Sequence, residues 1–343
     1  MQDNNDLMVI LSEAEELITQ DRFQEAIDIL EENLDFFENE VLFLNFLIRL
    51  YLFIKDPQSA LNYLNRALEI EQDNISSLEL AGEVYVNLKD WNQAILAWKR
   101  VIEIDERRYK IWKKIGNLYY KIGEYPKAVQ AYDNFLEYEN DIEIYSLLGV
   151  IYRKMGNDIE SWNNLMKAEQ MDPKNEMILL QIGETYFDLD NYDRAIDYYQ
   201  KVTKINPESI SAWFQLGKSL EIKQDSIQAI DAFSKVIELD PDNVLGFFHL
   251  AKIYAALANI EEATRYYEEC LSRDPAFIEA TLALASLSWA AKNNDKAIAY
   301  LEDSLRYNED NYQIYQMLGD IYEDLGEEEK ALRYWEKAAD LKE

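Results

Sequence analysis

Apolar residues recur along the whole chain in pairs of segments that are separated by short polar turns. In the stretch 210–243, the first apolar face is formed by Trp213, Leu216, Gly217 and Leu220, and the second by Ala229, Ile230, Phe233, Val236 and Ile237. Their i, i+3, i+4, i+7 spacing is that of one face of an α-helix. Each stretch of this kind therefore predicts two amphipathic helices, called helix A and helix B, joined by a turn.

A small residue followed by an alanine twelve positions later repeats about every 34 residues. The first members are Ala14, Ile48, Gly82, Gly116, Gly149, Gly183, Gly217, Ala251, Ala285 and Gly319, with Ile48 as the bulky exception. The second members are Ala26, Ala60, Ala94, Ala128, Ser161, Ala195, Ala229, Ala263, Ala297 and Ala331. Ten units in one register predict an all-α stacked repeat architecture.

Aligning the units on the small residue gives a tail and one continuous array. We expect a tail at 1–6 and a single array at 7–343, with units 7–40, 41–74, 75–108, 109–141, 142–175, 176–209, 210–243, 244–277, 278–311 and 312–343. The small residue is the eighth of its unit and is expected to face the alanine of helix B, so that the two helices pack closely. Large residues at the fourth, eleventh and twenty-fourth positions, such as Trp112, Tyr119 and Tyr132, would fill the space around that contact.

Glycine and proline mark the ends of the expected helices. Turn glycines that suit a positive φ are Gly123, Gly156 and Gly326. Prolines that follow Asp or Asn and stop helix B are Pro173, Pro207, Pro241 and Pro275.

The pattern resembles the tetratricopeptide repeat family over nearly the whole chain. Unit 109–141 reads Trp112-x2-Ile115-Gly116-x2-Tyr119, followed by Ala128-x3-Tyr132. The resemblance implies a right-handed superhelix of antiparallel helix pairs whose helices A line a concave groove. It also implies a scaffold or adaptor that binds a peptide or protein segment in that groove. The groove positions of helix A would be the second, fifth, sixth, ninth, twelfth and thirteenth.

The groove positions of unit 109–141 are basic, although the chain carries a net charge of −32. The stretch from Arg100 to Lys127 has eight basic and four acidic residues. Such a cluster can bind carboxylates, but the same lysines would also neutralise acidic neighbours along the superhelix. The candidate residues are Lys110, Lys113, Lys114, Asn117, Lys121 and, in the next unit, Arg153. The clamp with which one subgroup of the family grips chaperone tails is not expected, because Leu147 and Met177 replace its Asn and Lys.

Aromatic groove positions give a second candidate, in units 210–243 to 278–311. Its residues are Phe214, Lys218, Phe248, His249, Lys252 and Trp289. Aromatic anchors beside polar groups are typical of peptide binding, and partial burial between neighbouring helices is the alternative. His249 is the only histidine and there is no Cys/His cluster, so we predict neither a metal site nor a cofactor.

The helix expected at 41–54 is apolar almost all round, unlike an amphipathic repeat helix. Leu42, Phe46, Arg49 and Phe53 form a possible apolar interface. They would bind an apolar partner helix or self-associate into a homo-oligomer. Alternatively, the helix is apolar because it packs deeply against the unit 7–40. The C-terminal unit, which has no polar capping helix, is a second candidate for self-assembly.

Composition narrows the functional classes. The excess of 66 acidic over 34 basic residues argues against binding nucleic acid or anionic membranes. No apolar run reaches membrane-spanning length, and no signal peptide or lipid anchor is seen, so a cytoplasmic location is expected. The single cysteine, Cys270, is expected to be buried. No nucleophile–base pair or phosphate loop lies outside the repeat pattern. We therefore expect a non-enzymatic scaffold that binds a protein partner, with a self-assembling oligomer as the alternative.

Overall fold

The computed structural model describes the backbone of residues 2–342 and the side chains of residues 6–342, and its regular elements are helices. The chain divides into two compact units, Met1–Asn157 and Asp158–Glu343. From here on, a unit is one of these two parts, and the stretches of about 34 residues are called repeats. The first unit contains α1 (Gln2–Thr19), α2 (Phe23–Glu32), α3 (Leu34–Phe37), α4 (Val41–Phe53), α5 (Pro57–Ile70), α6 (Ile75–Asn87), α7 (Trp91–Ile104), the 3-10 helix η1 (Glu106–Arg108), α8 (Ile111–Lys121), α9 (Tyr125–Leu136) and α10 (Ile142–Lys154). The second contains α11 (Asp158–Met171), α12 (Glu176–Asp188), α13 (Tyr192–Ile205), α14 (Ile210–Ile222), α15 (Ser226–Leu239), α16 (Val244–Ala256), α17 (Ile260–Arg273), α18 (Ile278–Ala290), α19 (Asn294–Ser304), α20 (Tyr312–Asp324) and α21 (Glu328–Asp340).

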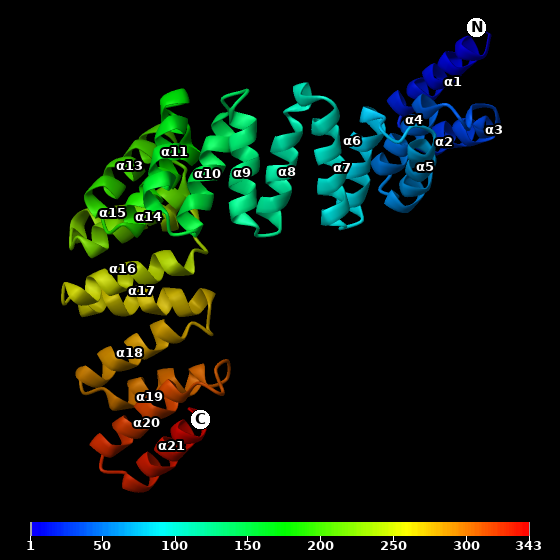
Figure 1. Ribbon diagram of the computed structural model, residues 1–343. Coiled ribbons are helices and arrows are strands. Elements are labelled where there is room, and N and C mark those ends of the chain that lie inside the picture. The colour runs from blue at the N-terminus through cyan, green and yellow to red at the C-terminus, as the bar shows by residue number, and fades with distance from the viewer. Residues whose placement is uncertain (1, 343) are drawn as a thin grey trace. The chain divides into compact units, whose positions relative to one another are not determined.

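Within each unit, successive helices pack as antiparallel pairs, as the repeat pattern predicts (Figure 1). The helices A include α4, α6 and α8 in the first unit and α12, α14, α16, α18 and α20 in the second. We call the surface that they form the helix-A face, and the surface formed by the helices B the helix-B face. Helix α1 begins at Gln2, within the segment expected as a tail, and Met1 lies outside the described residues. The boundary between the units falls inside the expected repeat 142–175.

Short polar side chains begin many of the helices. The Asp56 side chain accepts a hydrogen bond from the Ser59 N–H, and the Asn243 side chain accepts one from the Gly246 N–H. These caps satisfy amide groups that have no partner within the helix. At the other end, α13, α15 and α17 each stop at the Asp or Asn that precedes a proline, as expected.

The turn between helix A and helix B contains one residue with positive φ in every repeat. The three expected glycines adopt it, at φ 80° for Gly123, 72° for Gly156 and 75° for Gly326. In the other seven repeats a non-glycine residue takes the same conformation, namely Asp21, Lys55, Lys89, Asp190, Gln224, Ala258 and Lys292. The turn conformation is therefore common to all the repeats, but the sequence indicates it only at the three turns that contain glycine.

The glycine at the eighth position of helix A lies against the large residue at the twenty-fourth position. A Cβ placed on Gly116 would be 2.5 Å from Tyr132 Cε1, and one placed on Gly217 would be 2.8 Å from Phe233 Cζ. The expected contact with the alanine is thus incomplete, because the aromatic ring is the closest neighbour. The bulky exception Ile48 is fully buried in a repeat whose twenty-fourth residue is Leu64.

Cys270 is fully buried, as expected, and burial raises the pKa of its thiol to about 12.

Over residues 2–342, none of the helices has the length and apolar character required to cross a membrane.

Candidate functional site

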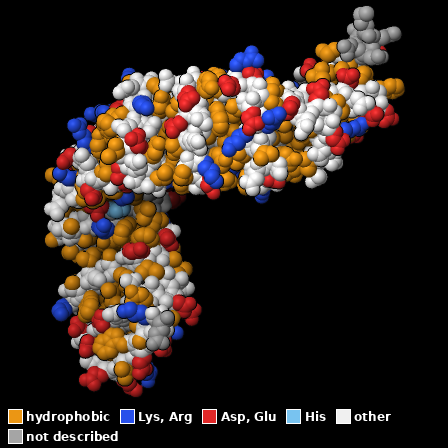
Figure 2. Space-filling model, in the orientation of Figure 1, with side chains coloured by type: hydrophobic (Ala, Val, Ile, Leu, Met, Phe, Trp, Pro, Cys, Tyr) orange, Lys and Arg blue, Asp and Glu red, His pale blue; other side chains and the backbone are white. Residues whose placement is uncertain are grey.

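The lysines of the basic candidate are paired with carboxylates from neighbouring repeats. Lys113 Nζ lies 2.8 Å from Asp141 Oδ2 and 2.7 Å from Glu143 Oε2, at the start of α10. On the other side of α8, Lys114 Nζ lies 2.7 Å from Glu83 Oε1 of α6. In Figure 2, Lys and Arg side chains lie beside Asp and Glu side chains over this part of the molecule. This arrangement favours the alternative that the lysines neutralise acidic neighbours.

The electrostatics of Lys113 fit that role. Burial alone would lower the pKa of Lys113, but its ion pairs with Asp141 and Glu143 outweigh burial and raise it above 10.5. Burial alone would likewise raise the pKa of Asp141, yet the pKa is held below 3.8 by Lys113 and by backbone N–H groups. Each group therefore stabilises the charged form of the other. Near neutral pH the Lys113 ammonium stays ion-paired with carboxylates of its own chain.

The remaining basic candidates have separate surroundings. Lys110 Nζ lies 3.8 Å from Glu139 Oε2, and its side chain is largely exposed. The Asn117 side-chain oxygen accepts a hydrogen bond of 2.7 Å from the Tyr132 hydroxyl. Lys121 Nζ lies 5.2 Å from the centre of the Trp91 ring, and Arg153 lies in the last turn of α10.

Three rings of the aromatic candidate meet on the helix-A face of the second unit. The His249 ring stacks on Phe233 at 4.7 Å between centroids with an interplanar angle of 4°. Phe214 of α14 meets His249 edge-on at 5.5 Å, and Phe248 of α16 does so at 5.8 Å. The array of Phe214, Phe248 and His249, here called the aromatic cluster, is half-buried.

Glu221 of α14 fixes the polar side of the aromatic cluster. Its carboxylate lies 2.6 Å from His249 Nδ1 and 2.8 Å from Lys252 Nζ. Burial would raise the pKa of Glu221, but its contacts with His249 and Lys252 lower it overall. The nearby Lys218 Nζ lies 4.9 Å from the Phe187 ring centre, and no carboxylate of residues 6–342 forms an ion pair with it.

Trp289 is not part of the aromatic cluster. Its indole N–H donates a hydrogen bond of 2.8 Å to Asp324 Oδ2 on α20. The structure thus brings together five of the six aromatic-candidate residues around α14 and α16, and it places Trp289 on the next pair of helices A.

Helix α4 is apolar all round because neighbouring helices cover most of its surface. Phe43, Leu44, Leu47 and Ile48 are fully buried among α1, α2, α5 and α6. Phe46 is half-buried and packs against this core. Leu42 and Phe53 remain 55% and 63% exposed, and Arg49 is exposed between them. Deep packing therefore accounts for most of the apolar character of α4. Leu42 and Phe53, near the two ends of the helix, are the large apolar side chains that remain exposed.

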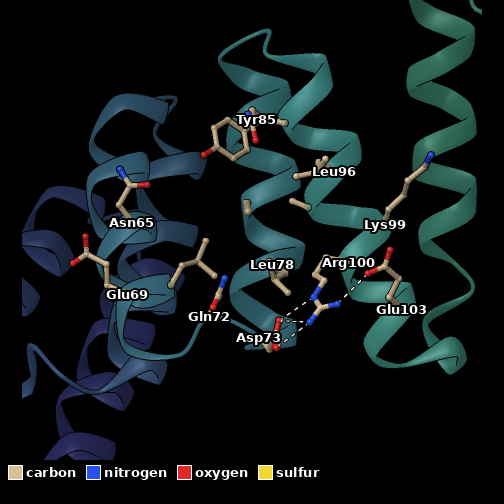
Figure 3. A pocket seen from close by; sticks show the side chains of 14 residues that line it. Asn65, Glu69, Gln72, Asp73, Leu78, Tyr85, Leu96, Lys99, Arg100 and Glu103 are labelled. Atoms are coloured by element: carbon tan, nitrogen blue, oxygen red, sulfur yellow. Dashed lines mark hydrogen bonds and ion pairs between the residues drawn. The ribbon is translucent and has the colours of Figure 1, made fainter.

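The helix-B face of the first unit contains a cleft that sequence reasoning missed. It has a volume of about 910 Å³ and lies between α5 and α7, above α6 (Figure 3). Leu68, Leu78, Ala81, Leu96 and Ala97 supply its apolar lining. At one end, Arg100 forms ion pairs of 3.0 Å with Asp73 and 3.1 Å with Glu103.

Comparisons with known proteins agree on one family. Tetratricopeptide repeat models match residues 142–175, 177–209, 210–243, 246–277 and 282–342, which together make up more than half of the chain. No match was found among curated proteins. Among solved structures, the C-terminal part of a TPR repeat-containing protein from Cytophaga hutchinsonii is 20% identical, with a TM-score of 0.61, and the match covers 69% of this chain and 98% of that one. A tetratricopeptide repeat protein from Parabacteroides merdae ATCC 43184 is 22% identical, with a TM-score of 0.53, and the match covers 68% and 93% of the two chains. At these identities the likeness shows the fold alone.

Proposed function

Because the chain belongs to the tetratricopeptide repeat family, whose members are typically protein-interaction scaffolds, we propose that it is a non-enzymatic scaffold. Its binding surface would be the helix-A face of the second unit. The observation that carries the proposal is the aromatic cluster, in which Phe214, Phe248 and His249 meet across two adjacent repeats.

The aromatic cluster offers both anchoring area and a fixed orientation. Phe214 and Phe248 are half-buried, so an incoming apolar side chain needs to displace little further water to contact them. Glu221 holds His249 and Lys252 in place before any partner arrives, which lowers the entropic cost of binding. Lys218, with no ion pair among the described residues, is available to a carboxylate of the bound segment.

The test is quantitative affinity capture from the source cells with Phe248→Ala and Lys218→Glu variants. We expect each variant to reduce recovery of the specific partner several-fold, because removal of an anchor at an interface centre costs about 2 kcal/mol or more. Ile227→Ala is the matched control, since Ile227 is 84% exposed on helix B α15. Unchanged recovery with both variants, each shown by circular dichroism to be folded, would refute binding on this face.

The basic cluster has a different role in this proposal. Its best-placed lysines, Lys113 and Lys114, already pair with α10 and α6, so we infer that they join adjacent repeats. A triple charge reversal of Lys110, Lys113 and Lys114 should therefore lower stability and leave partner recovery by the folded fraction unchanged. If the triple variant lost its partner without losing stability, these lysines would instead belong to the binding surface.

Self-assembly is a second candidate, and the exposed ends of α4 favour it. Leu42 and Phe53 are eleven residues apart, so they project from one side of the helix. Phe53→Glu is the appropriate test, because Phe46 is half-buried against the core and a charge there would disturb folding. Light scattering would show an oligomer that dissociates in Phe53→Glu if the candidate holds. A monomeric wild-type protein, or an oligomer that Phe53→Glu leaves intact, would reject this surface.

A further inference from the structure

Four repeats contain the same stacked pair of tyrosines, at the eleventh position of helix A and the twenty-third position overall. The pairs and their centroid distances are Tyr51–Tyr63 at 5.6 Å, Tyr186–Tyr198 at 5.7 Å, Tyr254–Tyr266 at 5.5 Å and Tyr322–Tyr334 at 5.4 Å. The second tyrosine can also reach the preceding helix B, as the hydrogen bond from Tyr198 to Glu169 shows. This ring therefore fills space between adjacent helices B.

Repeat 75–108 keeps the first tyrosine, Tyr85, and has Ala97 in place of the second. Two other repeats also have alanine at this position, but they compensate with tryptophan at the fourth position. These combinations are Trp112 with Ala131 and Trp213 with Ala232. Repeat 75–108 has Leu78 at the fourth position, so it lacks bulk at both places.

The cleft is the direct result of this double absence. It measures about 910 Å³, whereas the corresponding space beside Ala131, which Trp112 lines, measures about 240 Å³. In Figure 3, Tyr85 lies at one end of the gap between α5 and α7, and the ion pair of Asp73 with Arg100 lies at the other. An unfilled apolar space of this size next to an unstacked tyrosine suits a ring from outside the chain.

The charges around the cleft favour a basic occupant. The lining contains three acidic residues, Glu69, Asp73 and Glu103, and two basic ones, Lys99 and Arg100, so its net charge is −1. Arg100 pairs with both Asp73 and Glu103, but its single positive charge balances only one of them. Glu69 and Lys99, which are exposed and also line the cleft, form no ion pair within residues 6–342, so each is available to a bound segment. The net charge of −32 further attracts cationic segments over long range.

We propose that this cleft binds an aromatic side chain of a partner protein, carried on a segment with basic residues. The ring stacks on Tyr85, where a tyrosine of the chain itself stacks in four other repeats. Basic residues beside it pair with Glu69, and Leu96, which is 69% exposed, is covered by the segment. The site lies on the helix-B face of the first unit, so it is independent of the binding surface proposed for the second unit.

The probes are three blocked pentapeptides, Lys-Lys-Tyr-Lys-Lys, Lys-Lys-Leu-Lys-Lys and Glu-Glu-Tyr-Glu-Glu. Titration is followed by NMR of the labelled methyl groups of Leu78 and Leu96 in the full chain. We expect saturable shifts with the basic tyrosine peptide, and affinity about two- to ten-fold lower for the leucine peptide, because stacking is lost. The acidic peptide should bind more weakly still. Equal affinity for the tyrosine and leucine peptides, or no saturable shift, would overturn the proposal.

The deciding variant is Ala97→Tyr, which restores the tyrosine pair and closes the cleft. It should fold, since four repeats already accommodate that ring, and it should abolish the shifts. Ala97→Ser, which keeps the cleft open, is the matched control and should bind as the wild type does. Tyr85→Leu removes the stacking surface and should erase the preference for tyrosine over leucine, which keeps the proposal testable if Ala97→Tyr proves unstable.

Unchanged binding by Ala97→Tyr would place the peptide elsewhere and overturn the proposal. A wild-type dimer in sedimentation that Ala97→Tyr dissociates would make the occupant a second copy, against the proposal.

Discussion

At the scale of single residues, the eighth and twenty-fourth positions of each repeat share one volume. Gly116 leaves room for Tyr132, and Ile48 is accommodated in a repeat that has Leu64 instead of an aromatic residue. A larger residue at position 116 must therefore push against a ring that is fully buried and hydrogen-bonded to Asn117.

We predict that Gly116→Ile lowers the free energy of unfolding by about 1–3 kcal/mol through overpacking. Adding Tyr132→Leu should recover part of that loss, because the pair then reproduces Ile48 with Leu64. Urea unfolding of both single variants and the double variant measures the coupling as a double-mutant cycle. Purely additive losses would show that the two positions do not compete for space.

At the scale of helices, Asp141 serves α10 both as a cap and as a charge. Its side chain accepts hydrogen bonds from the N–H groups of Glu143, at 2.8 Å, and Ile144, at 3.2 Å, and it also pairs with Lys113 of α8. Asp141→Asn keeps an acceptor for the cap and removes the charge, whereas Asp141→Ala removes both.

We predict that Asp141→Asn lowers stability at pH 7 and that Asp141→Ala lowers it by about a further 1 kcal/mol. The pKa of Asp141 in the folded chain lies below its ordinary value of 3.8. The contribution of the charge is therefore fully present above pH 3.8 and is lost as the pH falls through the lower, folded value. Urea unfolding at a series of pH values should show wild type and Asp141→Asn converging in acid. A difference that stayed constant with pH would rule out the ion pair as its source.

The helices were predictable because their signals are local. Apolar spacing, proline after Asp or Asn, and the small eighth residue each fix one part of a repeat without knowledge of its neighbours. The seven positive-φ turns without glycine were not predictable, because residues such as Lys55 and Ala258 carry no local sign of that conformation. The partners of the lysines were also hidden, since Glu83 and Asp141 lie about one repeat away from α8.

At the scale of the whole molecule, both proposed binding surfaces depend on combinations of residues from several helices. Phe214, Phe248 and His249, which the family resemblance implied as groove residues, lie on the adjoining helices A α14 and α16, and their role in binding stays a prediction. Sequence reasoning missed Glu221, which lies 2.6 Å from His249 Nδ1. The cleft on the helix-B face was missed because Leu78 and Ala97 are each ordinary, and only their coincidence leaves the space empty.

The same scale governs the effect of salt. Many of the ion pairs among residues 6–342 are between exposed side chains, and each of these contributes little to stability. The 32 unbalanced negative charges, in contrast, repel one another in any compact form. Raising NaCl from about 0.01 M to about 1 M shortens the screening length from about 30 Å to about 3 Å, so it should weaken the repulsion more than the pairs. We predict that thermal stability rises, and each 1 kcal/mol gained should raise Tm by about 2–4 °C in units of this size. Differential scanning calorimetry over the NaCl series tests this. Lys113→Gln, which lacks the ion pairs of Lys113 with Asp141 and Glu143, is the control, and its Tm should rise at least as steeply. A Tm that falls with salt would mean that ion pairs between repeats outweigh the net charge.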